Sequence, residues 1–173
     1  DEVEEVEKEL RELVKRSEEV AREVKDRLRK LVEESERVVR ESRRKSREIV
    51  EEIRKKVRED LVREVEELVK RTIERSTELM EDNKRLVEEV EDRARKLVKE
   101  NEDLAREIVK EVRDRNVKDE ARRLVEEVKR SVEKSVKELE DLVEEVKRSV
   151  EESVKEAKEL NDRVDETVKR RAT

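Results

Sequence analysis

Apolar residues recur along the chain in adjacent pairs, and most pairs are five helical turns apart. The segment Leu124–Asp141 reads LVEEVKRSVEKSVKELED, and the segment that follows it reads LVEEVKRSVEESVKEAKE. Five turns take about 18 residues at about 3.6 residues per turn, so each pair returns to the same helical face. Because a seven-residue repeat would supercoil left-handed and an 11-residue repeat right-handed, this period predicts long, nearly straight helices. The pairs open at Leu13, Leu31, Ile49, Leu68, Leu86, Leu104, Leu124 and Leu142.

The phase of this repeat slips twice. The step from Ile49 to Leu68 is one position longer than the others, and the step from Leu104 to Leu124 is two positions longer. The phase changes place the breaks near residues 58–60 and 113–116. An inserted residue in one unbroken helix is an alternative that the phase alone leaves open. We expect three helices, over about 1–58, 61–113 and 117–173.

The ends of these helices carry weak signals. Asp60 and Asn116 are candidate N-caps, because their side chains accept hydrogen bonds from the first free backbone amides of a helix. Asn116 with Asp119 also imitates a capping box. No glycine is present to end a helix in the left-handed conformation. The exact turns are therefore poorly specified.

Polar residues that interrupt the apolar stripes indicate how the chain folds back. A reversal at residue 59 pairs positions whose numbers sum to 118, and a reversal near 116 pairs positions that sum to 232. The first matches Ser17 with Asn101, Ser35 with Asn83, Ser42 with Ser76, and Ser46 with Thr72. The second matches Asn101 with Ser131 and Asn83 with Ser149, and sets Ser135 and Ser153 opposite Leu97 and Leu79. The pattern predicts an all-α, antiparallel up-down-up three-helix bundle, a single domain over residues 1–173, with two shared polar layers.

Three interpretations of these polar positions stay open. Asparagine and serine in a core form hydrogen bonds that fix helix register, as a buried asparagine does in a coiled coil. Short polar residues are also tolerated at the edge of an apolar stripe. For Ser42, Ser46, Thr72 and Ser76, a third interpretation is a polar cavity or ligand pocket beside Ala157. Under the register interpretation, leucine at positions 83 and 101 is expected to keep or raise thermal stability.

The composition narrows the class of protein. Of 173 residues, 59% are charged, 31% are hydrophobic, and none is aromatic, Gly, Pro, Cys or His. Disulfides, thiolate metal sites and imidazole chemistry are impossible, and a sheet would lack its turn residues. No apolar run approaches the roughly 18 residues of a membrane span. Mixed charges with a net charge of only −6, in residues that favour helix, argue against disorder.

The near-identical repeat units, the caps without glycine, and the Ser and Asn layers at matching depths resemble de novo designed helical bundles. More narrowly, the chain is similar to parametrically generated, nearly untwisted bundles that carry built-in hydrogen-bond networks. Late-embryogenesis-abundant proteins and apolipoproteins fit less well, since the former have 11-residue repeats and the latter carry Pro and aromatics. The resemblance implies a structural scaffold without a natural biochemical function. Such designs usually have Gly, Pro or Ser-rich loops, from which this chain departs.

Candidate chemistry is sparse. Inward carboxylates with histidine, as in di-iron bundles, are not expected, so we predict no metal and no cofactor. Ser131 and Lys134 spell S-x-x-K, the string of penicillin-binding enzymes, without the accompanying motifs. Residues 40–47 hold five cations and one Glu, which we interpret as a solvated face rather than a nucleic-acid site. The chain is therefore not expected to be an enzyme or to bind nucleic acid or membranes, and its location is unspecified.

Two alternatives concern self-association. In the first, the bundle is an interaction module whose exposed valine-rich strip pairs with other copies, giving a homo-oligomer, or with a partner helix. The valines that would widen the stripe are Val38, Val39, Val132, Val136, Val150 and Val154. In the second, the chain is one long helix in an intermolecular coiled coil. Otherwise no partner is expected.

Overall fold

The computed structural model describes residues 2–56, 58–115 and 118–172, and every one of them except Arg58 lies in a helix. The helices are α1 (Glu2–Lys56), α2 (Glu59–Arg115) and α3 (Lys118–Ala172). They pack against one another as a three-helix bundle, which confirms the predicted fold class. The chain folds back on itself, so the single long helix of an intermolecular coiled coil is wrong.

The helix ends differ from the prediction by about one turn or less. α1 ends at Lys56 instead of 58, and α2 begins at Glu59 instead of 61 and continues to Arg115 instead of 113. The prediction of Asp60 as an N-cap is wrong, since Asp60 lies inside the first turn of α2. The Arg58 carbonyl accepts the backbone N–H groups of Leu61 and Val62 at 3.1 and 3.2 Å, so the backbone of Arg58 opens the helix. The proposed cap at Asn116 and helix start at 117 lie outside the described residues.

Charge at this turn favours the observed ends. The last turn of α1 carries Arg54, Lys55 and Lys56, and the first turn of α2 carries Glu59 and Asp60. Cations stabilise the negative end of a helix dipole and carboxylates the positive end, by about 0.3–1 kcal/mol each. With no Gly or Pro to stop it, each helix continues until the chain must reverse.

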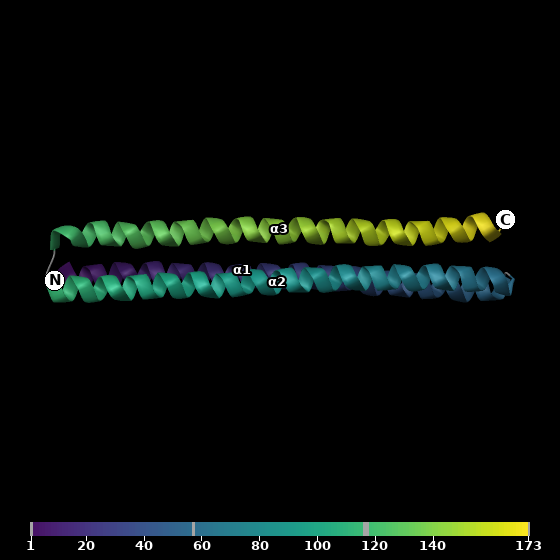
Figure 1. Cartoon of the computed structure of the whole chain (residues 1–173), viewed down its shortest axis with the longest axis horizontal. Coiled ribbons are helices and arrows are strands. Elements are labelled where there is room, and N and C mark those ends of the chain that lie inside the picture. Colours follow the sequence, from purple (N-terminus) through teal and green to yellow (C-terminus); the bar gives the residue numbers. More distant parts are fainter. Residues whose placement is uncertain (1, 57, 116–117, 173) are drawn as a thin grey trace. The chain divides into compact units, whose positions relative to one another are not determined.

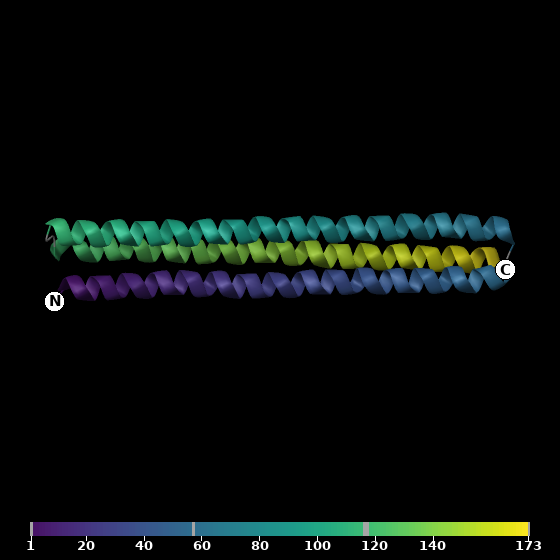
Figure 2. The ribbon, with the colours of Figure 1, turned by 90° about the horizontal axis from the view of Figure 1, so that it is seen from below.

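The chain forms two compact units, and each contains a segment of all three helices. The first unit comprises the described residues of Asp1–Leu28 and Glu88–Glu145, and the second those of Arg29–Val87 and Val146–Thr173. Within each unit, α2 runs antiparallel to α1 and α3, as the colour gradients of Figures 1 and 2 show. Helices distant in sequence therefore become neighbours within both units.

Valine dominates the core of the first unit. Val128 and Val132 of α3 are completely buried, and they belong to one cluster with Leu10 of α1 and Ile108 of α2. Burial of a Val or Leu side chain contributes about 1.5–3 kcal/mol. This gain exceeds the penalty for valine in a helix, which is below about 1 kcal/mol per residue. Valine is thus used here for packing, despite its helix propensity.

The second unit has a core of the same kind. Val65 and Val69 of α2 pack with Ile53 of α1 and Val164 of α3. Among the residues described, no large hydrophobic side chain is exposed. The proposed valine-rich strip is therefore not an exposed surface. Val39, Val132 and Val150 are buried, and Val38, Val136 and Val154 are half-buried.

The cation-rich stretch at residues 40–47 is helical and largely paired. Its ion pairs with carboxylates four residues away are Arg40–Glu36, Arg44–Glu48 and Lys45–Glu41. Arg43 donates instead to the hydroxyl of Thr77 on α2 at 2.6 Å. Exposed ion pairs contribute at most about 1 kcal/mol each, so these contacts neutralise the stretch more than they stabilise it.

Candidate functional site: the buried polar layers

Asn101 on α2 forms the centre of a polar layer in the first unit. Its side chain is 1% exposed. Nδ2 donates to Ser17 Oγ of α1 at 3.1 Å and to Ser135 Oγ of α3 at 3.2 Å. Oδ1 accepts from Ser131 Oγ of α3 at 2.7 Å. One amide thus joins three helices, and we call Ser17, Asn101, Ser131 and Ser135 the Asn101 layer.

The place of Ser135 in this layer differs from the prediction. The pairing predicted from the sequence placed Ser135 opposite Leu97 and therefore outside the layer. Ser131 and Ser135 lie one turn apart on the same face of α3, so one asparagine side chain reaches both. Ser135 Oγ also donates to the Ser131 backbone carbonyl at 2.9 Å, and its hydroxyl therefore both donates and accepts. The prediction missed it because it paired positions one to one.

The second unit repeats the arrangement around Asn83. Nδ2 of Asn83 donates to Ser35 Oγ at 3.4 Å and to Ser153 Oγ at 3.1 Å, and Oδ1 accepts from Ser149 Oγ at 2.8 Å. Ser153 Oγ donates to the Ser149 carbonyl at 2.8 Å, as Ser135 does to Ser131. Ser153 therefore joins its layer in the same way, although the sequence set it opposite Leu79. Ser35, Asn83, Ser149 and Ser153 form the Asn83 layer.

The remaining predicted positions, Ser42, Ser46, Thr72 and Ser76, are all buried in the second unit. Ser42 and Ser46 donate to Oδ1 of Asn161 on α3, at 3.1 and 3.4 Å. Thr72 Oγ1 donates to the Leu68 carbonyl of its own helix at 2.9 Å. Within the described residues the Ser76 hydroxyl has no hydrogen-bond partner. The predicted pairs thus share a level of the bundle without bonding each other.

Asn161 is the residue of this level that the sequence-based prediction missed. It stands directly after Leu160, where the repeat elsewhere places Val or Ala. That polar replacement was the available signal. Because α1 and α3 run parallel, two residues at the same level of these helices always differ in residue number by about the same amount. By that offset, Ser42 and Ser46 lie within one helical turn of the level of Asn161. A ligand pocket beside the buried Ala157 stays a prediction.

Charged groups on the helix surfaces add electrostatic links in each unit. In the first unit, the guanidinium of Arg93 donates to Glu138 at 2.7 and 3.2 Å. This hydrogen bond lowers the pKa of Glu138 and raises the pKa of Arg93. In the second unit, hydrogen bonds to Glu156 raise the pKa of Arg75. Each of these links joins α2 to α3.

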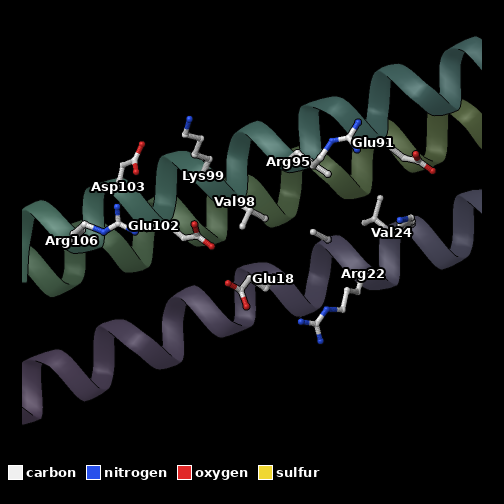
Figure 3. Close-up of a pocket in the computed structure, with 13 residues that line it drawn as sticks. Glu18, Arg22, Val24, Glu91, Arg95, Val98, Lys99, Glu102, Asp103 and Arg106 are labelled. Carbon is white, nitrogen blue, oxygen red and sulfur yellow. The ribbon is translucent and has the colours of Figure 1, made fainter.

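Glu18 and Glu102 form a different kind of pair in the first unit. Their carboxyl groups point toward each other between α1 and α2 (Figure 3). The hydrogen bond between them raises the pKa of Glu102, and burial and the charge of Glu18 act in the same direction. Two carboxyl groups that share a proton repel once both are ionised. This contact is therefore more favourable at acid pH.

The other candidate sites concern metal binding, membrane insertion and the S-x-x-K string. Across residues 2–56, 58–115 and 118–172, no cluster of three or more metal-ligating side chains occurs. No helix in the same residues carries an apolar stretch able to cross a membrane. Ser131, the serine of the S-x-x-K string, donates its hydroxyl hydrogen to Asn101 Oδ1, so that hydrogen is already engaged.

What the two layers can do chemically is join helices. Both amide hydrogens and the amide oxygen of each asparagine are bonded to serines of α1 and α3. A bonded amide in a core stabilises only those arrangements that bring its partners to the same level. Comparison with known proteins gives no relative: the sequence matches no family model, and no curated protein and no solved structure matches it.

Proposed function

We propose that the chain is a designed structural scaffold, a bundle that folds as a single domain and monomer and has no natural biochemical role. In this proposal the two asparagine layers specify which faces of the helices meet. One observation carries it: the same four-residue network is built twice, around Asn83 and around Asn101, at the spacing of the sequence repeat. Repetition of one hydrogen-bond network at one period is typical of designed bundles.

The energetic argument concerns alternatives to the native packing. A purely apolar core packs in several registers with similar free energies, because apolar contacts are not directional. A buried amide distinguishes these registers, since an arrangement that leaves it unbonded costs about 1–3 kcal/mol per group. Two layers double this penalty. The layers therefore support the proposed role as determinants of a unique fold.

The burial of valine supports the monomer. The valines of the strip that would mediate self-association are buried or half-buried, so the association of two copies through this strip would bury little additional apolar surface. A stable interface usually buries about 1,200–2,000 Å² in total. We therefore favour the scaffold over a homo-oligomeric interaction module.

Two measurements test the proposal. Light scattering should give one molar mass near 20.9 kDa from micromolar to millimolar concentration. Amide NMR spectra should show one resonance set for the native chain. A layer-free variant, with leucine for both asparagines and alanine for the six layer serines, should stay helical but give broadened or multiple resonances. Ser76→Ala is the matched control, because Ser76 is a buried serine outside both layers.

A stable dimer or trimer in the scattering experiment would contradict the monomer and favour the interaction module. A layer-free variant whose resonances are as sharp and single as those of the native chain would contradict the specifying role of the layers. A broadened spectrum of Ser76→Ala would show that any loss of a core hydroxyl disturbs the fold. That result would also count against the proposal.

A further inference from the structure

A groove runs along α1 and α2 in the first unit. It consists of two adjoining hollows of about 560 and 660 Å³, which share Glu18, Glu102 and Arg106 as lining residues. Figure 3 shows the first hollow, with side chains of α1 and α2 on its two sides. The groove extends from Glu7 to Lys25 on α1, which is about 27 Å at 1.5 Å per residue.

The floor of the groove is apolar. Three alanines, Ala21, Ala94 and Ala105, stand where larger side chains would fill the space between the helices. Val14 and Val98 line the same floor and are half-buried, so part of each side chain faces the groove. Two antiparallel helices with such a floor form the surface on which an added helix packs in a bundle.

The rim of the groove has the opposite charge to the rest of the chain. Eight Lys and Arg side chains and five carboxylates line the two hollows, in a chain whose net charge is −6. The hollow between α1 and α3 in the same unit is lined by three cations and three carboxylates. An excess of cations is thus particular to the groove of α1 and α2 in comparison with its neighbour.

Several of these cations are available to a partner. Among the described residues, Lys15, Arg22, Lys25 and Lys99 form no ion pair. In Figure 3, Arg22 and Lys99 point outward from the two opposite rims. Unpaired cations on both sides of an apolar floor match a ligand that is apolar on one face and acidic on both flanks.

We propose that this groove binds an acidic amphipathic helix of about 18 residues from another protein, with its apolar face on the floor and its carboxylates on the two rims. The proposal does not depend on the scaffold role. Glu18 and Glu102 face each other across the middle of the groove, so the favoured partner carries one Lys or Arg at its centre. That cation would separate two carboxylates that otherwise repel.

The test uses the full chain and two fluorescein-labelled helical peptides. Both peptides match the groove in length and have the same leucine and alanine face and a central lysine; one has glutamates on its flanks and the other has lysines. Fluorescence anisotropy should show binding of the acidic peptide at least tenfold tighter than binding of the basic one. Raising the salt from about 0.05 to about 0.5 M should weaken it severalfold, since screening shortens the range of charge attraction.

Matched variants localise the binding. Arg22→Glu with Lys99→Glu should weaken the acidic peptide at least tenfold. Arg16→Glu with Lys129→Glu changes the net charge equally in the hollow of α1 and α3, and should change the affinity less than twofold. Ala21→Leu fills the floor without changing charge, and should weaken binding at least tenfold while the circular dichroism spectrum stays native.

Three results would overturn the proposal. Equal affinity for the two peptides would mean that only apolar contact matters. Equal weakening by the two charge-reversal variants would mean that the whole chain, and not the groove, attracts the peptide. If light scattering shows a dimer, and Ala21→Leu dissociates that dimer, the groove would be the binding site for a second copy of this chain instead.

Discussion

Asn101 of α2 donates from Nδ2 to Ser17 Oγ of α1 at 3.1 Å, although 84 positions separate the two residues in the sequence. The same amide bonds to Ser131 and Ser135 of α3. A single side chain thus holds three helices of the first unit at one level. Removal of the Asn101 side chain therefore takes a hydrogen-bond partner from three serine hydroxyls at once.

Asn101→Leu is expected to lower the free energy of unfolding by about 1–3 kcal/mol, because serine hydroxyls of α1 and α3 lose a buried partner. From the sequence alone, leucine at this position was expected to keep or raise thermal stability while loosening the helix register. Urea unfolding followed by circular dichroism measures the difference. Asn101→Leu combined with alanine at 17, 131 and 135 should regain most of the loss. A single variant as stable as the native chain would show that the serines find other partners.

Ser76→Ala is expected to leave stability unchanged or to raise it by about 1 kcal/mol. The Ser76 hydroxyl is 0% exposed and has no partner within the described residues, so it loses no hydrogen bond on removal. Ser135→Ala is the matched control, and should destabilise by about 1–2 kcal/mol because it removes a hydroxyl that donates and accepts. The same urea experiment compares them. A loss with Ser76→Ala as large as that with Ser135→Ala would reveal a bond to Ser76.

Glu102→Gln is expected to stabilise the protein at pH 8 and to lose this advantage toward pH 3.5. The hydrogen bond with Glu18 raises the pKa of Glu102 in the folded state above its unfolded value of about 4.3. Folding therefore favours the protonated form, and that stabilisation is complete below the unfolded pKa and is lost as the pH rises through the folded pKa. Glutamine keeps an uncharged hydrogen-bonding group at every pH.

The measurement for this pair is the urea midpoint of both proteins between pH 3.5 and 8 at low salt. Glu107→Gln, an exposed position on the same helix, serves as the control for the loss of one negative charge. The opposite trend, with Glu102→Gln less stable at pH 8 than the native chain, would mean that the ionised carboxylate makes a favourable contact.

The sequence by itself determined the three helices and two of the three serine partners of Asn83 and of Asn101. The five-turn period acts locally, through the geometry of the helix, and it continued without interruption from Leu31 to Ile49 where the apolar residues are fewest. The sums of 118 and 232 then followed from antiparallel pairing, because the residue number rises along one helix as it falls along its antiparallel neighbour. Ser17, Ser35, Ser131 and Ser149 bond to their asparagines as that arithmetic requires.

The tertiary structure decided what depends on reach and on rotation about each helix axis. Ser135 and Ser153 joined the layers because an asparagine amide spans one turn of the neighbouring helix. Asn161 accepts the hydrogen bonds of Ser42 and Ser46 because α3 lies beside α1 at that level of the second unit. The cation-rich groove and the facing Glu18 and Glu102 depend on which flank of each helix turns toward its neighbour. A period in sequence sets the apolar face of a helix, whereas the packing of whole side chains sets the angle at which that face meets the others.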